Sequence, residues 1–413
     1  MAGARESGYT GDLMRFSPLV LLLAPALSAA PAISPNGIVN ANGYQSLLAP
    51  GVVFVAFGTG LGPAAIVAAS APNYPAALAG TSIRFTRAGG GAPVEARVVY
   101  TVGTQVAGLL PSSVTPGDYS VTITYNGETS PPRPVTVVAR SFGIATANSA
   151  GTGPAQATIG NVNGGISLVR LTTGTTSFGG YDWPLSPARP GDTLVLWGTG
   201  GGADPANDTG GTSGDQTAAG NFKVVIGGRE VTPLYAGASS GYPGLWQINF
   251  TVPPDATLDC FVPVAVSANG ELSNVVTIAI APPGQTSCTT AGLPASALSK
   301  VDAGGMITGG GFSFTRATAT NSFVLPDGTR TPSVTATVET VQGGINRYSA
   351  AAIAELNSGI RIDRCIVFQK TDFQTRIGIG IPDGSLDAGL RIPVSGPGVP
   401  AGAAMDRVPN NLY

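Results

Sequence analysis

The sequence predicts an all-β protein of tandem antiparallel sandwiches, followed by a smaller, mainly β C-terminal unit. Three observations predict this fold class. Short runs rich in Val, Ile, Thr and Tyr are separated by turn residues. Gly and Pro, which favour turns, number 59 and 34, and neither half of the repeated region contains a long amphipathic helical pattern. Finally, much of the chain is repeated.

The repeat begins at residues 50–60, whose sequence PGVVFVAFGTG returns at residues 190–200 as PGDTLVLWGTG. Further matches follow in the same order. They pair Val98-Val99-Tyr100 with Pro233-Leu234-Tyr235, Gly108-Leu109 with Gly244-Leu245, Asn126-Gly127 with Asn269-Gly270, and residues 135–137 with residues 276–278. Collinear matches of this kind predict two copies of one β module with different loop insertions.

Four segments are expected along the chain. Residues 1–32 have the pattern of an export signal, with Arg15 before an apolar run from Leu19 to Leu27 and small residues after it. Translation could also start at Met14. The first repeat then occupies residues 33–139, the second occupies 140–281 with its N-terminal connecting strand, and the C-terminal unit occupies 282–413, which could be truncated.

Strand pairs can be located from turn residues. Residues 119–125 alternate strictly and precede Asn126-Gly127, a pair that favours a type I′ hairpin turn, so residues 134–138 are expected to return as a partner strand. Asn269-Gly270 and Gly227-Gly228 predict two more hairpins in the second repeat. In the C-terminal unit we expect strands at 312–315, 333–338, 361–369 and 376–381, and one helix at 348–356.

Several motifs resemble one known family. They are Asn40-Ala41 with residues 48–51, residues 57–63 and 78–83, and, in the second copy, residues 235–237, 243–249 and Val252-Pro253. Together they resemble the uncharacterised Ig-like C-terminal domain of Solibacter-type acidobacterial secreted proteins. The resemblance implies two tandem secreted Ig-like sandwiches of unknown role, and it carries over no catalytic residue. The first copy departs from the pattern at residues 108–111.

Composition excludes several classes of function. Only 11% of residues are charged, against about a quarter in ordinary proteins, and the net charge is −2. A nucleic-acid partner is therefore not expected. There is no histidine, which removes the commonest general base and metal ligand. We expect no cofactor, apart from the calcium considered below, and no membrane span in the mature chain.

Three cysteines fit an oxidising compartment but leave one unpaired. We favour a disulfide between Cys260 and Cys288, which flank the last hairpin of the second repeat. Cys365 would then be a buried free thiol in an apolar strand. A bridge between Cys288 and Cys365 is the main alternative.

Two sets of residues are candidates for binding. Flat aromatic rings with nearby carboxamides suit a sugar or a peptide, and this set consists of Tyr235, Tyr242, Trp246, Gln247 and Asn249. For Trp246 itself we favour a buried core position, since a buried Trp commonly anchors a sandwich. Oxygen ligands for Ca²⁺ are offered by Asp204, Asn207, Asp208 and Asp215, although we favour a solvated turn loop for these four residues.

These features predict an exported, non-enzymatic protein for extracellular attachment, spacing or ligand binding, with an extracellular protein or a polysaccharide as partner. Residues 237–241 match Gly-x-Ser-x-Gly, but without a histidine to accept the serine proton we interpret them as a loop. One alternative is a hydrolase with its catalytic carboxylates in the C-terminal unit, among Asp363, Asp372, Asp383 and Asp387. Another is a dedicated carbohydrate- or calcium-binding module. The two repeats are expected to unfold separately or with weak coupling.

Overall fold

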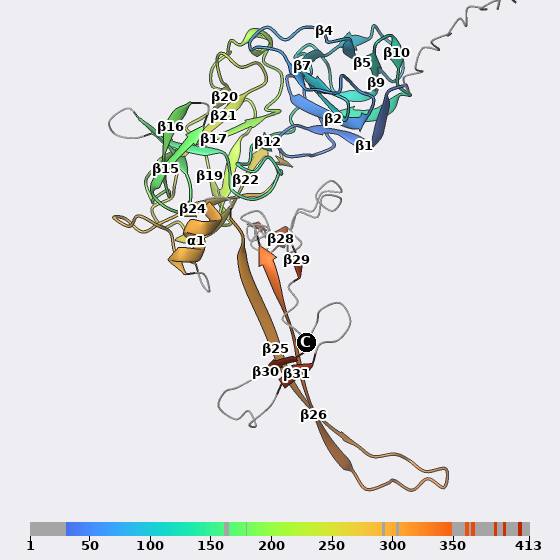
Figure 1. The fold of residues 1–413 in the computed structure, drawn as a ribbon, viewed down its shortest axis with the longest axis vertical. Coiled ribbons are helices and arrows are strands. Elements are labelled where there is room, and N and C mark those ends of the chain that lie inside the picture. Colours follow the sequence, from blue (N-terminus) through green and yellow to red (C-terminus); the bar gives the residue numbers. More distant parts are fainter. Residues whose placement is uncertain are drawn as a thin grey trace, which may run out of the picture.

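The computed structural model describes residues 30–160, 165–178, 180–290, 294–302 and 305–348, together with short strands between residues 360 and 406. These residues form an all-β protein, as the sequence predicts: two sandwiches are followed by a short helix and a long ribbon (Figure 1). All but the last three residues of the expected export signal lie outside the described residues. Among the described helices, none is long and apolar enough to cross a membrane.

The first sandwich consists of two antiparallel sheets that enclose one apolar core. Phe54 and Phe85, one from each sheet, meet edge to face in that core with ring centroids 5.3 Å apart. One sheet has the order β1-β2-β8-β7-β3, with β1 (Ala32–Asn40), β2 (Val53–Thr59), β8 (Gln105–Leu109), β7 (Arg97–Val102) and β3 (Val67–Ala68). The other has the order β10-β9-β5-β4, and in it β11 also pairs with β9 and β6 with β5. Its strands are β10 (Glu128–Thr129), β9 (Gly117–Tyr125), β5 (Thr81–Arg87), β4 (Ala77–Leu78), β11 (Arg133–Val137) and β6 (Val94–Glu95).

The second sandwich has the same layered form, with extra strands at one edge of its first sheet. That sheet has the order β15-β16-β14-β13-β17-β21-β20, with β12 also paired to β17. Its strands are β15 (Gly174–Phe178), β16 (Tyr181–Ser186), β14 (Ile166–Val169), β13 (Ala157–Gly160), β17 (Thr193–Thr199), β21 (Trp246–Thr251), β20 (Tyr235–Ala238) and β12 (Gly143–Ile144). The facing sheet has the order β19-β18-β22-β23, with β24 also on β22. Its strands are β19 (Arg229–Val231), β18 (Lys223–Ile226), β22 (Asp259–Ala268), β23 (Glu271–Leu272) and β24 (Val276–Ile280).

Strand order and register show which positions of the two sandwiches correspond. The order β2-β8-β7 in the first matches β17-β21-β20 in the second. Phe57 lies opposite Gln105 in the first, and Trp197 lies opposite Gln247 in the second. The expected match of Gly108-Leu109 with Gly244-Leu245 is therefore wrong. The counterpart of Gln247 in the first sandwich is another glutamine, Gln105. That both sandwiches arose from one duplicated module stays a prediction.

The hairpins predicted from turn residues are confirmed. Asn126 and Gly127 have φ angles of 49° and 88° between β9 and β10, and Asn269 and Gly270 have 52° and 88° between β22 and β23. Both residues of a type I′ turn need positive φ, which Asn and Gly tolerate best. The expected partner strand of β9 is β11, and Gly227-Gly228 joins β18 to β19.

The two sandwiches contact each other through buried polar groups. The Asn40 carboxamide donates to the carbonyl oxygens of Ser141 (3.0 Å) and Thr199 (3.4 Å), and the Val53 N–H donates to the Thr199 hydroxyl (2.9 Å). Packing is also close, because a Cβ atom on Gly244 would lie 2.5 Å from Val53 Cγ2. We therefore expect cooperative rather than separate unfolding, in contrast to the expectation from the sequence.

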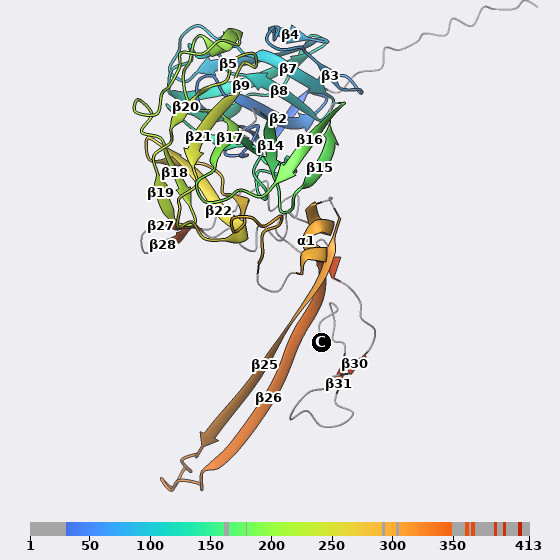
Figure 2. The same cartoon turned by 90° about the vertical axis from the view of Figure 1, so that its left-hand side faces the viewer.

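After the sandwiches, α1 (Ala295–Asp302) packs Leu298 and Val301 against the second sandwich. The strands β25 (Ile307–Asn321) and β26 (Val334–Tyr348) then form a ribbon that projects away from both sandwiches (Figures 1 and 2). It contains the strands expected at 312–315 and 333–338. The sequence analysis missed α1, which is too short for a helical period to stand out. The helix and the last strand expected at 348–356 and 376–381 fall almost entirely outside the described residues.

The remaining described strands are short. They are β27 (Ile360–Ile362), β28 (Cys365–Val367), β29 (Gly384–Ser385), β30 (Arg391–Pro393) and β31 (Ala404–Asp406). Cys260 and Cys288 form a disulfide with Cα atoms 5.1 Å apart, which is the pairing favoured from the sequence. Both cysteines are buried beside α1. The side chain of Cys365 lies outside the described residues.

Candidate functional site

The loop between β17 and β18 carries the residues considered as calcium ligands. Asp204 is 1% exposed, and its carboxylate accepts hydrogen bonds from the Ser213 hydroxyl (2.6 Å) and the Ser213 N–H (3.0 Å). The Asn207 carboxamide accepts from the Gly244 N–H (2.6 Å) and donates to the Ser239 carbonyl (3.2 Å). These side chains hold the loop in shape.

The other two acids of this loop point elsewhere. Asp208 accepts hydrogen bonds from Ser112 of the first sandwich, whereas Asp215 accepts from Thr217 and from the Ala236 N–H. Among the described residues, no three acidic, Cys or His side chains gather where they could hold a metal ion. The calcium-site prediction is wrong for this loop, because its oxygen atoms already accept hydrogen bonds from the protein and do not converge.

Trp246 belongs to the core and cannot stack on a ligand. It is 1% exposed and packs on Phe222, with ring centroids 5.9 Å apart. A Cβ atom on Gly201 would lie 2.2 Å from the indole, which explains why glycine stands there. Including Trp246 among the candidate ligand-binding residues is therefore wrong, and the core position favoured from the sequence is confirmed.

Three of the other proposed ligand-binding residues do come together. In the ladder Tyr235 lies opposite Asn249, and Gln247 lies opposite Trp197. Residues directly opposite each other in a ladder share a face, as do alternate residues of one strand. Tyr235, Gln247 and Asn249 therefore share the outer face of their sheet with Trp197, while Leu196, Ile248 and Ala236 face the core. We call these four residues the aromatic–amide face.

The aromatic–amide face is partly exposed. Its four side chains are all of intermediate exposure. Trp197 and Tyr235 are separated by two strand spacings and two residues, which places their Cα atoms about 12 Å apart. The Trp197 indole N–H donates to the Thr158 hydroxyl (3.3 Å), and the Tyr235 hydroxyl donates to the Ala238 carbonyl (3.3 Å). Asn249 Oδ1 is buried and accepts no hydrogen bond from the described residues.

The sequence analysis missed Trp197, although a signal for it was present. Successive side chains of residues 193–197 point to opposite faces of the sheet. Leu194 and Leu196 are buried, so Trp197 must face outward. The corresponding position in the first sandwich is Phe57, which also lies opposite a glutamine, Gln105. Recognising this register would have identified both aromatic residues.

The first sandwich repeats the arrangement in a more covered form. Phe57, Tyr100 and Gln105 stand where the second sandwich has Trp197, Tyr235 and Gln247. The position of Asn249 is taken by Ala107, which is 1% exposed. Tyr44 packs on Phe57 with ring centroids 6.4 Å apart. Burial, and to a lesser extent the neighbouring Tyr44, raises the pKa of the Tyr100 phenol. The second sandwich therefore differs from the first in presenting a partly exposed carboxamide, Asn249, where the first has the buried Ala107.

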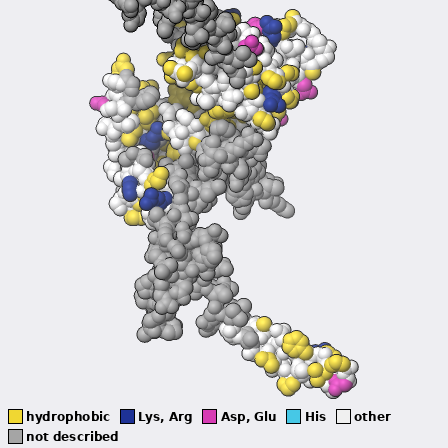
Figure 3. Space-filling view, turned by 45° about the vertical axis from the view of Figure 1, so that its right-hand side comes forward, with side chains coloured by type: hydrophobic (Ala, Val, Ile, Leu, Met, Phe, Trp, Pro, Cys, Tyr) yellow, Lys and Arg dark blue, Asp and Glu magenta, His cyan; other side chains and the backbone are white. Residues whose placement is uncertain are grey.

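Tyr242 lies away from the aromatic–amide face, on the loop between β20 and β21, and is 60% exposed. Its partner is Tyr74 of the first sandwich, whose pKa is raised by burial and then by the Tyr242 phenol. The backbone brings their loops together: Gly241 N–H donates to the Gly210 carbonyl (2.7 Å), and a Cβ atom on Gly210 would lie 2.9 Å from Pro72 Cβ. Apolar side chains gather where the two sandwiches meet (Figure 3).

Comparison with known proteins assigns no family. No family model matches the chain, and no curated protein matches it. Similar solved structures include surface glycan-binding protein B of a mixed-linkage glucan utilization locus of Bacteroides ovatus, in complex with a heptasaccharide. It has 13% identity and a TM-score of 0.25, over 58% of this chain and 44% of that chain.

Two further structures are surface glycan-binding proteins as well. The protein of Prevotella bryantii has 13% identity and a TM-score of 0.16, over 60% of this chain and 41% of that one. The protein from a xyloglucan utilization locus of Bacteroides uniformis has 11% identity and a TM-score of 0.18, over 76% and 66%. This chain thus spans less than half the length of the first two. Similarities this distant assign no function.

Proposed function

We propose that this chain is an exported, non-catalytic protein that binds a polysaccharide through the aromatic–amide face. The observation that carries the proposal is the placement of Trp197 and Tyr235 on either side of two carboxamides, Gln247 and Asn249, on one face of the sheet. Aromatic rings offer flat apolar faces to sugar C–H groups, and carboxamides both donate to and accept from hydroxyl groups.

Other features support the setting of this function. A disulfide such as Cys260–Cys288 persists in oxidising compartments, which supports export to the cell surface or the medium. A partly exposed sheet face suits a polymer that passes across it, whereas small molecules are usually enclosed in pockets. The contacts between the sandwiches would hold this face in a fixed orientation, as attachment or spacing requires.

The proposal is tested by measuring binding of the purified chain to a panel of soluble polysaccharides by affinity electrophoresis and calorimetry. For a polysaccharide that binds, we expect Trp197→Ala and Gln247→Ala each to weaken binding about tenfold or more. Tyr181→Ala is the matched control, because Tyr181 is 72% exposed on the same sandwich but lies on β16. It should bind like the unaltered chain.

Two results would contradict the proposal. One is an equal loss of binding in the Tyr181→Ala control, which would mean that no particular face is used. The other is hydrolysis of the bound polysaccharide by the purified chain, which would favour the hydrolase alternative. The carboxylates considered for that alternative lie outside the described residues.

A further inference from the structure

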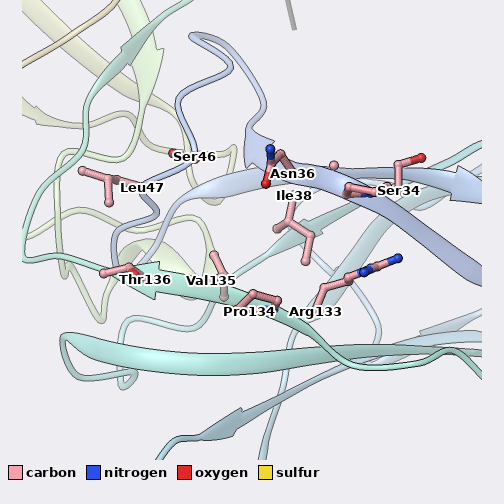
Figure 4. Close-up of a pocket in the computed structure, with 11 residues that line it drawn as sticks. Ser34, Asn36, Ile38, Ser46, Leu47, Arg133, Pro134, Val135 and Thr136 are labelled. Atoms are coloured by element: carbon pink, nitrogen blue, oxygen red, sulfur yellow. The ribbon is translucent and has the colours of Figure 1, made fainter. Parts of the chain in front are cut away.

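A groove of about 350 Å³ lies between the edge strands β1 and β11 of the first sandwich, and we call it the β1–β11 groove (Figure 4). Ile38 and Val135 point toward each other across it. Arg133 lies at one end, where its Nε donates to the Ile33 carbonyl (3.0 Å). The other lining residues are Ser34, Pro35, Asn36, Gly37, Ser46, Leu47, Pro134 and Thr136.

The backbone of β11 faces this groove with polar groups. Thr136 accepts a hydrogen bond at its carbonyl from the Leu48 N–H (3.1 Å), so this residue turns its backbone away from β9. Alternate residues of a strand turn the same way. The carbonyl group of Pro134 therefore faces the groove too, although Pro134 has no N–H to offer.

The second sandwich has the same edge, and there the chain covers it with a segment of its own. The segment around Pro154 runs parallel to β24, with Pro154 paired to Thr277. The Ala155 N–H donates to the Thr277 carbonyl (2.8 Å), and the Thr277 N–H donates to the Gly153 carbonyl (2.8 Å). An extended segment of small residues thus fills the position that is open in the first sandwich.

Independent contacts show that Thr277 and Pro134 are corresponding positions. Ser130 and Ser273 precede the two strands, and each hydroxyl accepts from a backbone N–H of the neighbouring strand, Ile123 (3.0 Å) or Val266 (2.8 Å). Farther along, Leu48 bridges to Val137 in parallel, and Ala188 bridges to Ile280 in the same way. Pro134 lies four residues after Ser130 and three before Val137. Thr277 likewise lies four residues after Ser273 and three before Ile280, so the two positions correspond.

The same comparison explains why the groove is open. In the second sandwich, residues 145–156 form a long connection between β12 and β13. The Asn274 carboxamide holds it by donating to the carbonyls of Ile144 (2.9 Å) and Gly151 (2.8 Å). In the first sandwich the corresponding connection is only residues 34–37, which form an irregularity within β1. Pro131 occupies the position of Asn274 and has no carboxamide to hold a longer segment. Among the described strands β1 pairs with β2 and β11 pairs with β9, so the two strands form no ladder with each other, and the Arg133 side chain joins them at the Ile33 carbonyl.

We propose that the β1–β11 groove binds an extended peptide segment of a partner protein, with small uncharged residues at its centre. The segment would run parallel to β11, as Gly153, Pro154 and Ala155 run along β24. It would donate a backbone N–H to the Pro134 carbonyl and rest on Ile38 and Val135. Pro134 removes one of the two backbone hydrogen bonds seen in the second sandwich, so the groove resists indiscriminate strand pairing.

A fluorescent peptide with the sequence of residues 150–156 and blocked termini tests this proposal by anisotropy with the full chain. We expect saturable binding. Pro134→Thr restores the missing N–H donor and should tighten binding roughly three- to tenfold. Ser46→Trp places a large side chain at the end of the groove and should abolish it. Pro132→Thr, outside the groove lining, is the matched control and should not tighten binding.

The outcomes separate this proposal from its alternatives. Absence of saturable binding to both the unaltered chain and a folded Pro134→Thr variant overturns it. An equal gain in Pro132→Thr overturns it too, because the effect would then not be local to the groove. Concentration-dependent self-association blocked by Ser46→Trp would replace the partner protein with a second copy of this chain. Loss of polysaccharide binding in Trp197→Ala leaves the peptide result unchanged, since the two sites lie on different sandwiches.

Discussion

The carboxylate of Asp208 in the second sandwich is held by one residue of the first, Ser112. The Ser112 N–H lies 3.1 and 3.0 Å from the two carboxylate oxygens, and its hydroxyl lies 2.8 Å from Oδ1. Ser112 is 7% exposed, and its hydroxyl also accepts from the Asp204 N–H (3.2 Å). The loop of one sandwich is thus fastened to a turn of the other by charge-assisted hydrogen bonds.

We predict that Asp208→Ala weakens the coupling between the sandwiches. Hydrogen bonds to a charged group contribute about 1.5–3 kcal/mol, and Ser112 would lose its acceptor. Calorimetry should show one transition for the two sandwiches in the unaltered chain, and a lower or divided transition in the variant. Asp182→Ala is the control, because Asp182 is exposed and accepts from Ser177 of the adjoining strand. Two transitions in the unaltered chain would contradict the coupling.

Trp246→Ala should destabilise the second sandwich by about 3–5 kcal/mol, the usual cost of deleting a large buried aromatic side chain. The indole packs against Phe222 and Gly201 in the core, so its removal would leave a cavity. Chemical denaturation measures the loss. A cost under about 1 kcal/mol would mean that the core packs differently. Trp197→Ala should cost less, because part of that side chain is exposed.

Removing the disulfide should lower stability as well. The bridge joins residues 28 positions apart. On the loop-entropy model a bridge of this span contributes roughly 3–4 kcal/mol. We expect a Cys260→Ser, Cys288→Ser double variant to melt at a lower temperature than the unaltered chain under non-reducing conditions. Peptide mapping without reduction checks the pairing, and a disulfide peptide that contains Cys365 would contradict it.

We predict that the Asp215 carboxylate makes a contribution to stability that depends on pH. Hydrogen bonding by the Thr217 side chain, reinforced by the backbone N–H groups of Thr217 and Ala236, lowers the pKa of Asp215 below its usual 3.8. A lowered pKa in the folded state means that the charged form is stabilised by folding. This contribution is fully present above about pH 4 and is lost as the pH falls through the folded-state value.

The measurement compares melting temperatures of the unaltered chain and Asp215→Asn across a pH series. The difference between them should be constant from pH 7 to pH 5 and should shrink below pH 4. A difference that grows in acid would mean that the folded state raises this pKa instead of lowering it. Asp215 is largely exposed, so the effect should be small.

Sequence patterns predict the local part of this fold well. Asn-Gly and Gly-Gly pairs identify hairpins because the turn itself demands positive φ at both positions. The alternation along β9 and β22 also follows burial, because Val121 and Ile123 lie in the core of the first sandwich and Val264 and Val266 lie in the core of the second. Contacts between distant segments were not predictable in this way. Asn40 meets Thr199 across 159 positions, and no local pattern indicates such a contact.

The candidate site shows the same limit. Tyr235, Gln247 and Asn249 could be proposed from the chemistry of their side chains. The register of β21 with β17 is needed to see that Trp197 lies on the same outer face, and that Trp246 lies on the opposite face, in the core. The four oxygen-bearing residues of the acidic loop were plausible calcium ligands by composition. Their partners are N–H and O–H groups of Ser112, Ala236 and Gly244 in three other segments, and of Ser213 in the same loop, which composition does not reveal.

The position of the disulfide also matters for mechanical load. If the ribbon of β25 and β26 were pulled by something attached to its tip, tension would travel through α1 toward the second sandwich. The covalent bridge would carry that tension directly from Cys288 to Cys260, so residues 261–287 would bear none of it. The last hairpin of the sandwich and its edge strand β24 would stay folded under force, because they lie inside a closed loop that the pull bypasses.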